Sequence, residues 1–195
     1  MKRIALAVLT ALVSTQMFAQ LNVQLHYDFG NTIYGNELDN RPHLTATVEN
    51  FKADKWGSTY FFVDANFKDN TMESAYAEIS RELKFWKAPI AAHVEYNGGL
   101  SGHGSYNDAY LVGPAYNWAS KDFKKTFSLQ LLYKYLANQK IGTKHSWQIT
   151  TVWGINFANG LCTFSGYADL WHDNSVNGSL VLSSEPQFWF NLAAL

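Results

Sequence analysis

The sequence is poor in charge and in cysteine, and it has one strongly apolar run, at its N-terminus. Only 16% of the 195 residues are charged, against about 25% in ordinary soluble domains. Cys162 is the single cysteine, which excludes an internal disulfide. Beyond the N-terminal segment, no run reaches the ~18 consecutive apolar residues that a membrane helix needs. If the mature chain enters a membrane, it must therefore cross it with β-strands.

The N-terminal segment, residues 1–19, has the organisation of a secretory signal peptide. Lys2 and Arg3 form a short basic region, an apolar run follows, and a polar stretch leads to Ala19. We expect cleavage after Ala19, export from the cytoplasm, and a mature β-domain over residues 20–195. The net charge of −1 comes without a basic patch, so nucleic acid is not an expected partner.

Apolar and polar residues alternate along the rest of the chain, most clearly at residues 58–67. Thr59, Phe61 and Val63 share one face there, while Tyr60 and Asp64 share the other. Alternation with a period of two is typical of a strand with one apolar and one polar face, the unit of transmembrane barrels. The pattern predicts an all-β, antiparallel transmembrane barrel of ten strands, near residues 21–29, 44–49, 58–67, 74–85, 90–97, 107–118, 127–135, 147–157, 162–171 and 180–190.

One predicted strand, residues 74–85, would also suit a helix by propensity. As a strand it places Arg81 on the apolar face. An arginine that faces lipid is costly at mid-membrane but tolerated near the interface, and a β-bulge would also turn it away. We interpret the segment as a strand that has Arg81 near its end.

The connections between predicted strands favour a membrane barrel, since outer-membrane barrels combine short periplasmic turns with longer external loops. Aromatic residues also gather at both predicted strand ends, as in the interfacial girdles of such barrels. The longer, Gly- and Asn-rich connections alternate with shorter ones; the longer lie near residues 30–41, 68–73, 98–106, 137–144 and 173–178, and the shorter near 52–57, 86–88, 119–125 and 158–160.

If the apolar face meets outer-membrane lipid, the polar face lines the interior. Acidic residues outnumber basic ones there, which disfavours anions and suits cations or neutral polar solutes that stack on aromatic rings. No nucleophile motif or HExxH pair occurs, so we expect neither an enzyme nor a metal or cofactor. The candidate residues of the solute pathway are His26, Asp28, Glu49, Tyr60, Asp64, Glu78, His93, Glu95, Lys134, Tyr167, Asp169 and Glu185.

Two other interpretations stay open on the sequence alone. An exported soluble barrel that binds an apolar ligand would turn the apolar faces inward. A barrel enzyme could use an acid–base pair such as His26 with Asp28 or His93 with Glu95.

Five segments carry a family resemblance: LTATVENFKADKWGSTYFFVD (44–64), AEISRELKFW (77–86), HVEYNGGL (93–100), LCTFSG (161–166) and LSSEPQFWFNL (182–192). They resemble an uncharacterised outer-membrane β-barrel family related to the nucleoside-specific, Tsx-like channel-forming proteins. The resemblance implies a closed antiparallel barrel that passes nucleosides or similar small polar solutes. Such chains continue for another hairpin, to twelve strands, so this one either closes with ten or lacks its C-terminal hairpin.

Overall fold

Antiparallel strands make up most of the structure. The computed structural model describes residues 21–38, 40–140, 142–173 and 179–194, and the predicted signal peptide lies outside them. All ten predicted strands are present, which confirms the all-β antiparallel fold. They are β1 (Leu21–Tyr27), β2 (Leu44–Asp54), β3 (Gly57–Lys68), β4 (Thr71–Leu83), β5 (Ile90–Ser101), β7 (Ala109–Ala119), β8 (Lys125–Leu136), β9 (His145–Phe157), β10 (Cys162–His172) and β11 (Leu180–Phe190).

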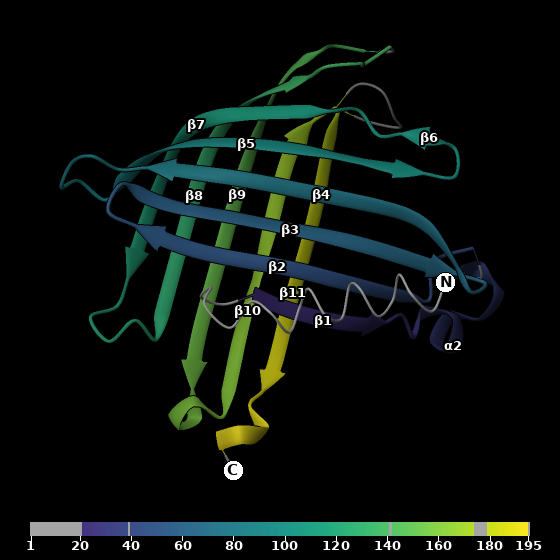
Figure 1. The fold of residues 1–195 in the computed structure, drawn as a ribbon, viewed down its shortest axis with the longest axis horizontal. Helices are drawn as coiled ribbons and strands as arrows, with labels where there is room; N and C mark the ends of the chain where they lie inside the picture. Colours follow the sequence, from purple (N-terminus) through teal and green to yellow (C-terminus); the bar gives the residue numbers. More distant parts are fainter. Residues whose placement is uncertain (1–20, 39, 141, 174–178, 195) are drawn as a thin grey trace, which may run out of the picture.

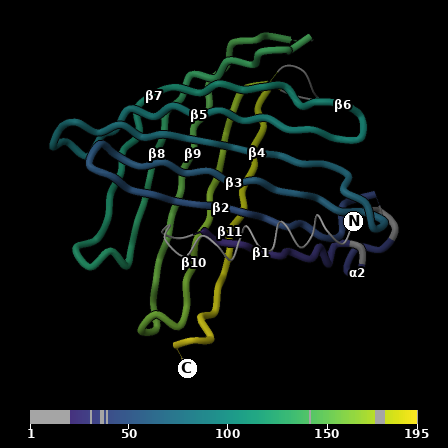
Figure 2. Tube along the Cα trace, in the orientation of Figure 1, coloured from purple at the N-terminus to yellow at the C-terminus, as the bar shows by residue number. Residues whose placement is uncertain are grey.

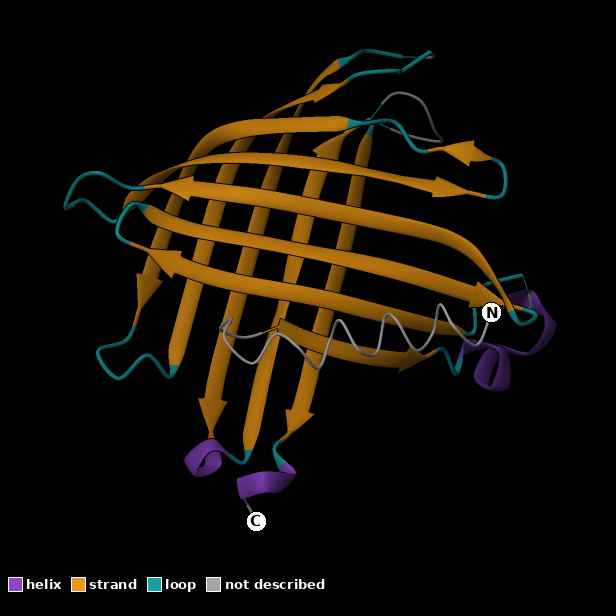
Figure 3. Cartoon of the chain, viewed as in Figure 1, coloured by secondary structure: helices purple, strands orange, loops and turns teal. Residues whose placement is uncertain are grey.

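Short elements occupy several connections, and one follows the last strand, as Figure 3 shows. The two-residue strand β6 (Gly104–Ser105) pairs with β5 and was not predicted. The helical segments are α2 (Gly30–Tyr34), η1 (Gly35–Leu38), η2 (Ala158–Gly160) and η3 (Leu192–Ala194). None of the helices among the described residues has the length and hydropathy to cross a membrane.

A single sheet runs from β1 to β11, each long strand pairing with the next along the chain. In Figure 1, β2 to β5 run across the front and β8 to β11 run steeply behind them, with β7 at the bend. The Cα trace in Figure 2 shows the same two crossed groups. The sheet therefore curls into a half-barrel whose front and back walls face each other.

The edges of the sheet, β1 and β11, come close to each other without pairing among the described residues. His26 near the end of β1 and Trp189 near the end of β11 have ring centroids 6.5 Å apart. Both residues are near the C-terminal ends of strands that run in opposite directions, so the two edges meet with a stagger, as tilted barrel strands require. Pro186 lies in the edge strand β11, where its missing N–H donor is tolerated.

The inner face of the sheet is polar and the outer face is apolar. The strand register pairs inner-face residues with inner-face residues of the next strand. Thr47, for example, is opposite Asp64, and Asp64 is opposite Tyr76. The buried polar residues include His93, Asn97, Gln130, Lys134, Gln148 and Thr150. The exposed apolar residues include Leu25, Val63, Ile79, Val94, Val112 and Leu131. A small apolar cluster lies on the inner face where β7 meets β8, formed by Ala109, Leu111, Leu132 and Leu136.

The predicted long connection at residues 68–73 is wrong. Strands β3 and β4 continue to Lys68 and Thr71, which leaves a two-residue turn. Asp69 and Asn70 both have positive φ, 49° and 63°, and Asp and Asn tolerate this left-handed conformation in tight hairpins. The polar composition of this segment therefore reflects a tight turn.

Candidate functional site: the acidic interior

The front and back walls of the interior lie close enough for their charges to interact. Glu78 on β4 is within electrostatic range of Asp169 on β10 and of Lys134 on β8. Asp64 on β3 is likewise within range of Glu185 on β11. Strands that are distant in the pairing order therefore enclose one shared space.

Carboxylates dominate the inner face away from the strand ends. The basic side chains on the same face are Lys134 and the imidazoles of His26 and His93. The predicted excess of acid is thus concentrated on the enclosed side of the sheet. The carboxylates are Glu49, Asp64, Glu78, Glu82, Glu95, Asp169 and Glu185.

His93 on β5 lies between two carboxylates and is only 2% exposed. Its Nε2 is 2.9 Å from Glu95 Oε2, and its Nδ1 is 3.6 Å from Glu82 Oε1. Glu82 also accepts a hydrogen bond of 2.6 Å from the Asn117 amide. Gly113 is the cross-strand partner of His93, and the nearest atoms to a side chain at Gly113 would be those of the β8 backbone at Leu131 and Leu132.

Lys134 on β8 places its ammonium group in a site made from a carbonyl oxygen and an aromatic ring. Nζ donates to Gln148 Oε1 at 2.8 Å and lies 4.7 Å from the centroid of the Trp171 ring. Asp169 and Glu95 are within electrostatic range of the same ammonium. This wall of the interior therefore has the chemistry that recognises an alkylammonium ion.

Four aromatic rings form a row on the front wall. Neighbouring centroids are 6.1 Å apart for Tyr60 and Phe62, 6.0 Å for Phe62 and Tyr76, and 6.3 Å for Tyr76 and Tyr106. The Tyr76 hydroxyl donates to Glu78 Oε1 at 2.6 Å. The row offers flat apolar surfaces edged by polar groups, which suits a planar polar solute.

A sequence-family model described as a domain of unknown function (DUF5020) matches residues 19–195. The chain belongs to this family. No curated protein and no solved structure matches the chain. The family description names no activity and no solute, so the relation to Tsx-like channels and the passage of nucleosides stay predictions.

The remaining predicted wall residues form hydrogen bonds with, or pair with, residues on neighbouring strands. Glu49 accepts hydrogen bonds from Asn22 and Gln24, both at 2.8 Å, and from Tyr60 at 2.9 Å. Asp64 accepts one of 2.5 Å from Thr47. The last two predicted wall residues, Tyr167 and Glu185, are cross-strand partners on β10 and β11.

Asp28 belongs to a connection and not to a strand wall. It follows the end of β1, accepts a hydrogen bond of 2.7 Å from the Gly30 backbone, and lies 3.2 Å from Arg41 Nε. Its carboxylate therefore organises the connection between β1 and β2.

Several residues of the site are missing from the candidate set. The period-two alternation does place Glu82, Phe62, Tyr76 and Trp171 on the polar face, whereas Tyr106 lies in a segment expected to be a connection. Their importance depends on partners from other strands, which the alternation alone does not give.

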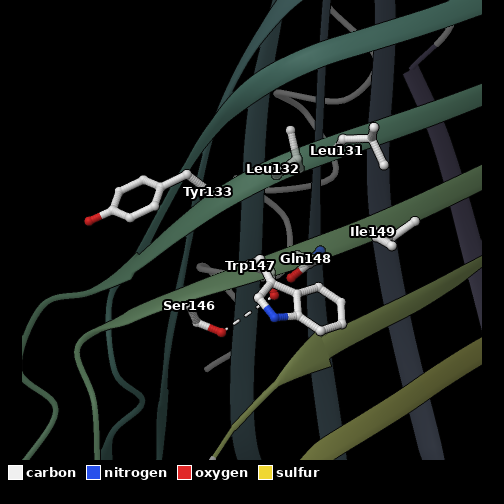
Figure 4. Close-up of a pocket in the computed structure, with 7 residues that line it drawn as sticks. All are labelled: Leu131, Leu132, Tyr133, Ser146, Trp147, Gln148 and Ile149. Atoms are coloured by element: carbon white, nitrogen blue, oxygen red, sulfur yellow. Dashed lines mark hydrogen bonds between the residues drawn. The ribbon is translucent and has the colours of Figure 1, made fainter.

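A separate groove lies on the outer face between β8 and β9. It has a volume of about 410 Å³, and the outward side chains Leu131, Tyr133, Trp147 and Ile149 contribute to its lining (Figure 4). Gln148, between two of these residues, points to the opposite face and binds Lys134. The groove is therefore distinct from the acidic interior.

No group of three or more His, Cys, Asp or Glu side chains is placed to hold a metal ion in the part of the chain that the structure describes. The carboxylates instead lie spread along several strands of the interior.

Proposed function

We propose that this chain is an outer-membrane β-barrel through which small polar solutes diffuse, with cations and neutral solutes favoured over anions. The observation that carries the proposal is the orientation of the faces: buried His93, Gln148 and Lys134 are polar, while exposed Val63 and Val112 are apolar. A protein in water would place these faces the other way round, whereas a barrel in lipid requires this arrangement.

The strand lengths and aromatic ends fit a membrane. Apart from β1 and β6, the strands have 11 to 13 residues, and a tilted transmembrane strand needs about 9–11. Aromatic pairs occur at both ends, with centroids 5.5 Å apart for Trp56 and Phe85 and 5.4 Å apart for Tyr96 and Tyr110. Such pairs suit the two interfacial girdles.

The interior supports a narrow, acid-lined pathway. His93, Gln148 and Asn97 are less than a tenth exposed, so neighbouring side chains fill much of the space around each of them. Barrels with few strands leave little free interior, and we therefore expect only small solutes to pass. The ring row from Tyr60 to Tyr106, together with the family resemblance, makes nucleosides the first neutral solutes to test.

The alternative, a soluble barrel around an apolar ligand, needs an apolar inner wall. The small cluster of Leu111 and Leu132 is the nearest approach to one, but Lys134, Gln130 and Gln148 surround it on the same face. The inner wall therefore favours polar solutes.

Swelling of liposomes that contain the refolded mature chain tests the proposal. We expect swelling in nucleosides, small sugars and zwitterionic amino acids, with lysine faster than glutamate. Liposomes with a heat-denatured sample control for leakage. Absence of swelling in every solute would contradict the channel function, and faster entry of glutamate would contradict the acidic pathway.

A further inference from the structure

Negative charge exceeds positive charge in the middle of the interior. Lys134 and the His93 imidazole face a group of four carboxylates, Glu78, Glu82, Glu95 and Asp169. Among the described residues, four carboxylates thus face one ammonium and one imidazole. Because an isolated buried charge is costly, the cluster favours a bound cation.

Two buried carbonyl oxygens beside these carboxylates lack hydrogen-bond donors. Asn97 Oδ1 and Gln130 Oε1 each expose less than 1 Å² and have no partner within the described residues. Asn97 is the cross-strand partner of Glu78. Gln130 is the partner of Thr150, whose hydroxyl donates to Asp169 at 2.6 Å. Because a carbonyl oxygen can only accept, any species that binds these two atoms must bring N–H or O–H donors or be a cation.

The chemistry of the wall favours ammonium groups over a metal ion. Lys134 already presents one ammonium to a carbonyl oxygen and to the Trp171 ring, contacts that suit an alkylammonium ion. In the described residues, the carboxylates do not converge on one point as metal ligands would. Charges spread along the interior match a cation whose two charges are held apart by an apolar chain.

We infer that the middle of the interior binds a linear aliphatic diammonium ion. Glu78, Glu95 and Asp169 supply the charge, and the carbonyl oxygens of Asn97 and Gln130 accept hydrogen bonds from the ammonium groups. The inference rests on the proposed function and narrows its cation preference to one solute class.

Isothermal titration calorimetry on the folded mature chain in detergent micelles tests this inference. The titrants are 1,4-diaminobutane, the uncharged 1,4-butanediol of similar length, and magnesium chloride. We expect saturable binding of the diamine alone. Equal binding of the diol, stronger binding of magnesium, or no diamine binding would each overturn the inference.

Matched variants locate the site. Asp169→Asn should weaken diamine binding about tenfold, the scale of one lost charge contact, whereas Lys134→Met should strengthen it by removing a competing positive charge. Asp122→Asn removes a carboxylate in the turn between β7 and β8, outside the interior, and should leave the affinity unchanged. Equal affinity in Asp169→Asn and in Lys134→Met would overturn the inference, and heat-modifiable gel migration identifies variants that fail to fold.

Failure of this inference is distinguishable from failure of the channel. Calorimetry in micelles requires no transport, so diamine binding without liposome swelling would support the site while contradicting the channel. Swelling in neutral solutes without diamine binding would overturn the site and leave the channel supported.

Discussion

Arg81 and Asp54 form an ion pair on the outer face of the barrel, with 2.8 Å between Nη1 and Oδ2. Arg81 also donates to the Thr59 hydroxyl at 2.9 Å. The sequence predicts that Arg81 faces outward and allows a bulge to relieve it, but the bulge between β3 and β4 is at Asn66 and Phe67, at the far end of the hairpin. The arginine instead binds Asp54 and Thr59 near the end of the strands. In the proposed membrane orientation this end would lie near the interface, where a charge costs little.

Removing Asp54 should destabilise the barrel, because the outward Arg81 would lose its charged partner. We expect Asp54→Ala to lower the urea midpoint in lipid vesicles, and Arg81→Leu in the same background to recover part of the loss. A double-mutant cycle measures the coupling. Additive effects of the two substitutions would show that the pair does not stabilise the barrel.

Gly113 is predicted to be intolerant of a side chain. A Cβ built at this position would lie 2.0 Å from the Leu131 carbonyl oxygen on β8. We expect Gly113→Ala to force β7 and β8 apart and to cost about 1–3 kcal/mol, the usual range for overpacking. Gly102→Ala is the control, since a Cβ there meets nothing within 4 Å. Equal urea midpoints for both variants would contradict this close approach.

The local alternation predicted most of the fold, but not the contacts that make the site. At residues 58–67 the pattern assigns both faces of β3 correctly, because side-chain direction depends only on parity. The position of His93 between Glu82 and Glu95 depends on the register of β4 against β5, and the approach of Glu78 to Asp169 depends on how the sheet curls. Neither relationship can be predicted from the local sequence pattern.

Adjacent residues on β3 should report opposite environments. In a Cys162→Ser background, an environment-sensitive fluorophore on Val63→Cys should show the blue-shifted emission of lipid contact in vesicles. The same fluorophore on Asp64→Cys should emit as in a polar site, because Val63 faces outward and Asp64 accepts a hydrogen bond from Thr47 on the inner face. Similar spectra at both positions would contradict the proposed orientation in lipid.

Inner carboxylates should set the charge preference of the pathway. We expect Glu49→Lys, Asp64→Lys and Glu95→Lys each to reduce the preference for potassium over chloride in planar bilayers, since each places a positive charge on the wall. Asp122→Lys is the control, because Asp122 lies in the turn between β7 and β8. A hydrogen bond from Ser120 lowers the pKa of Asp122, so its carboxylate is ionised at neutral pH. Equal shifts in the control and the wall variants would place selectivity outside the barrel wall.

The reversal potential of the unmodified mature chain in a planar bilayer, under a potassium chloride gradient, tests the central claim most directly. A barrel with lipid outside and an acidic pathway inside should conduct, with a reversal potential of the sign set by potassium. An anion-selective potential, or reproducible insertion without any conductance, would contradict the account.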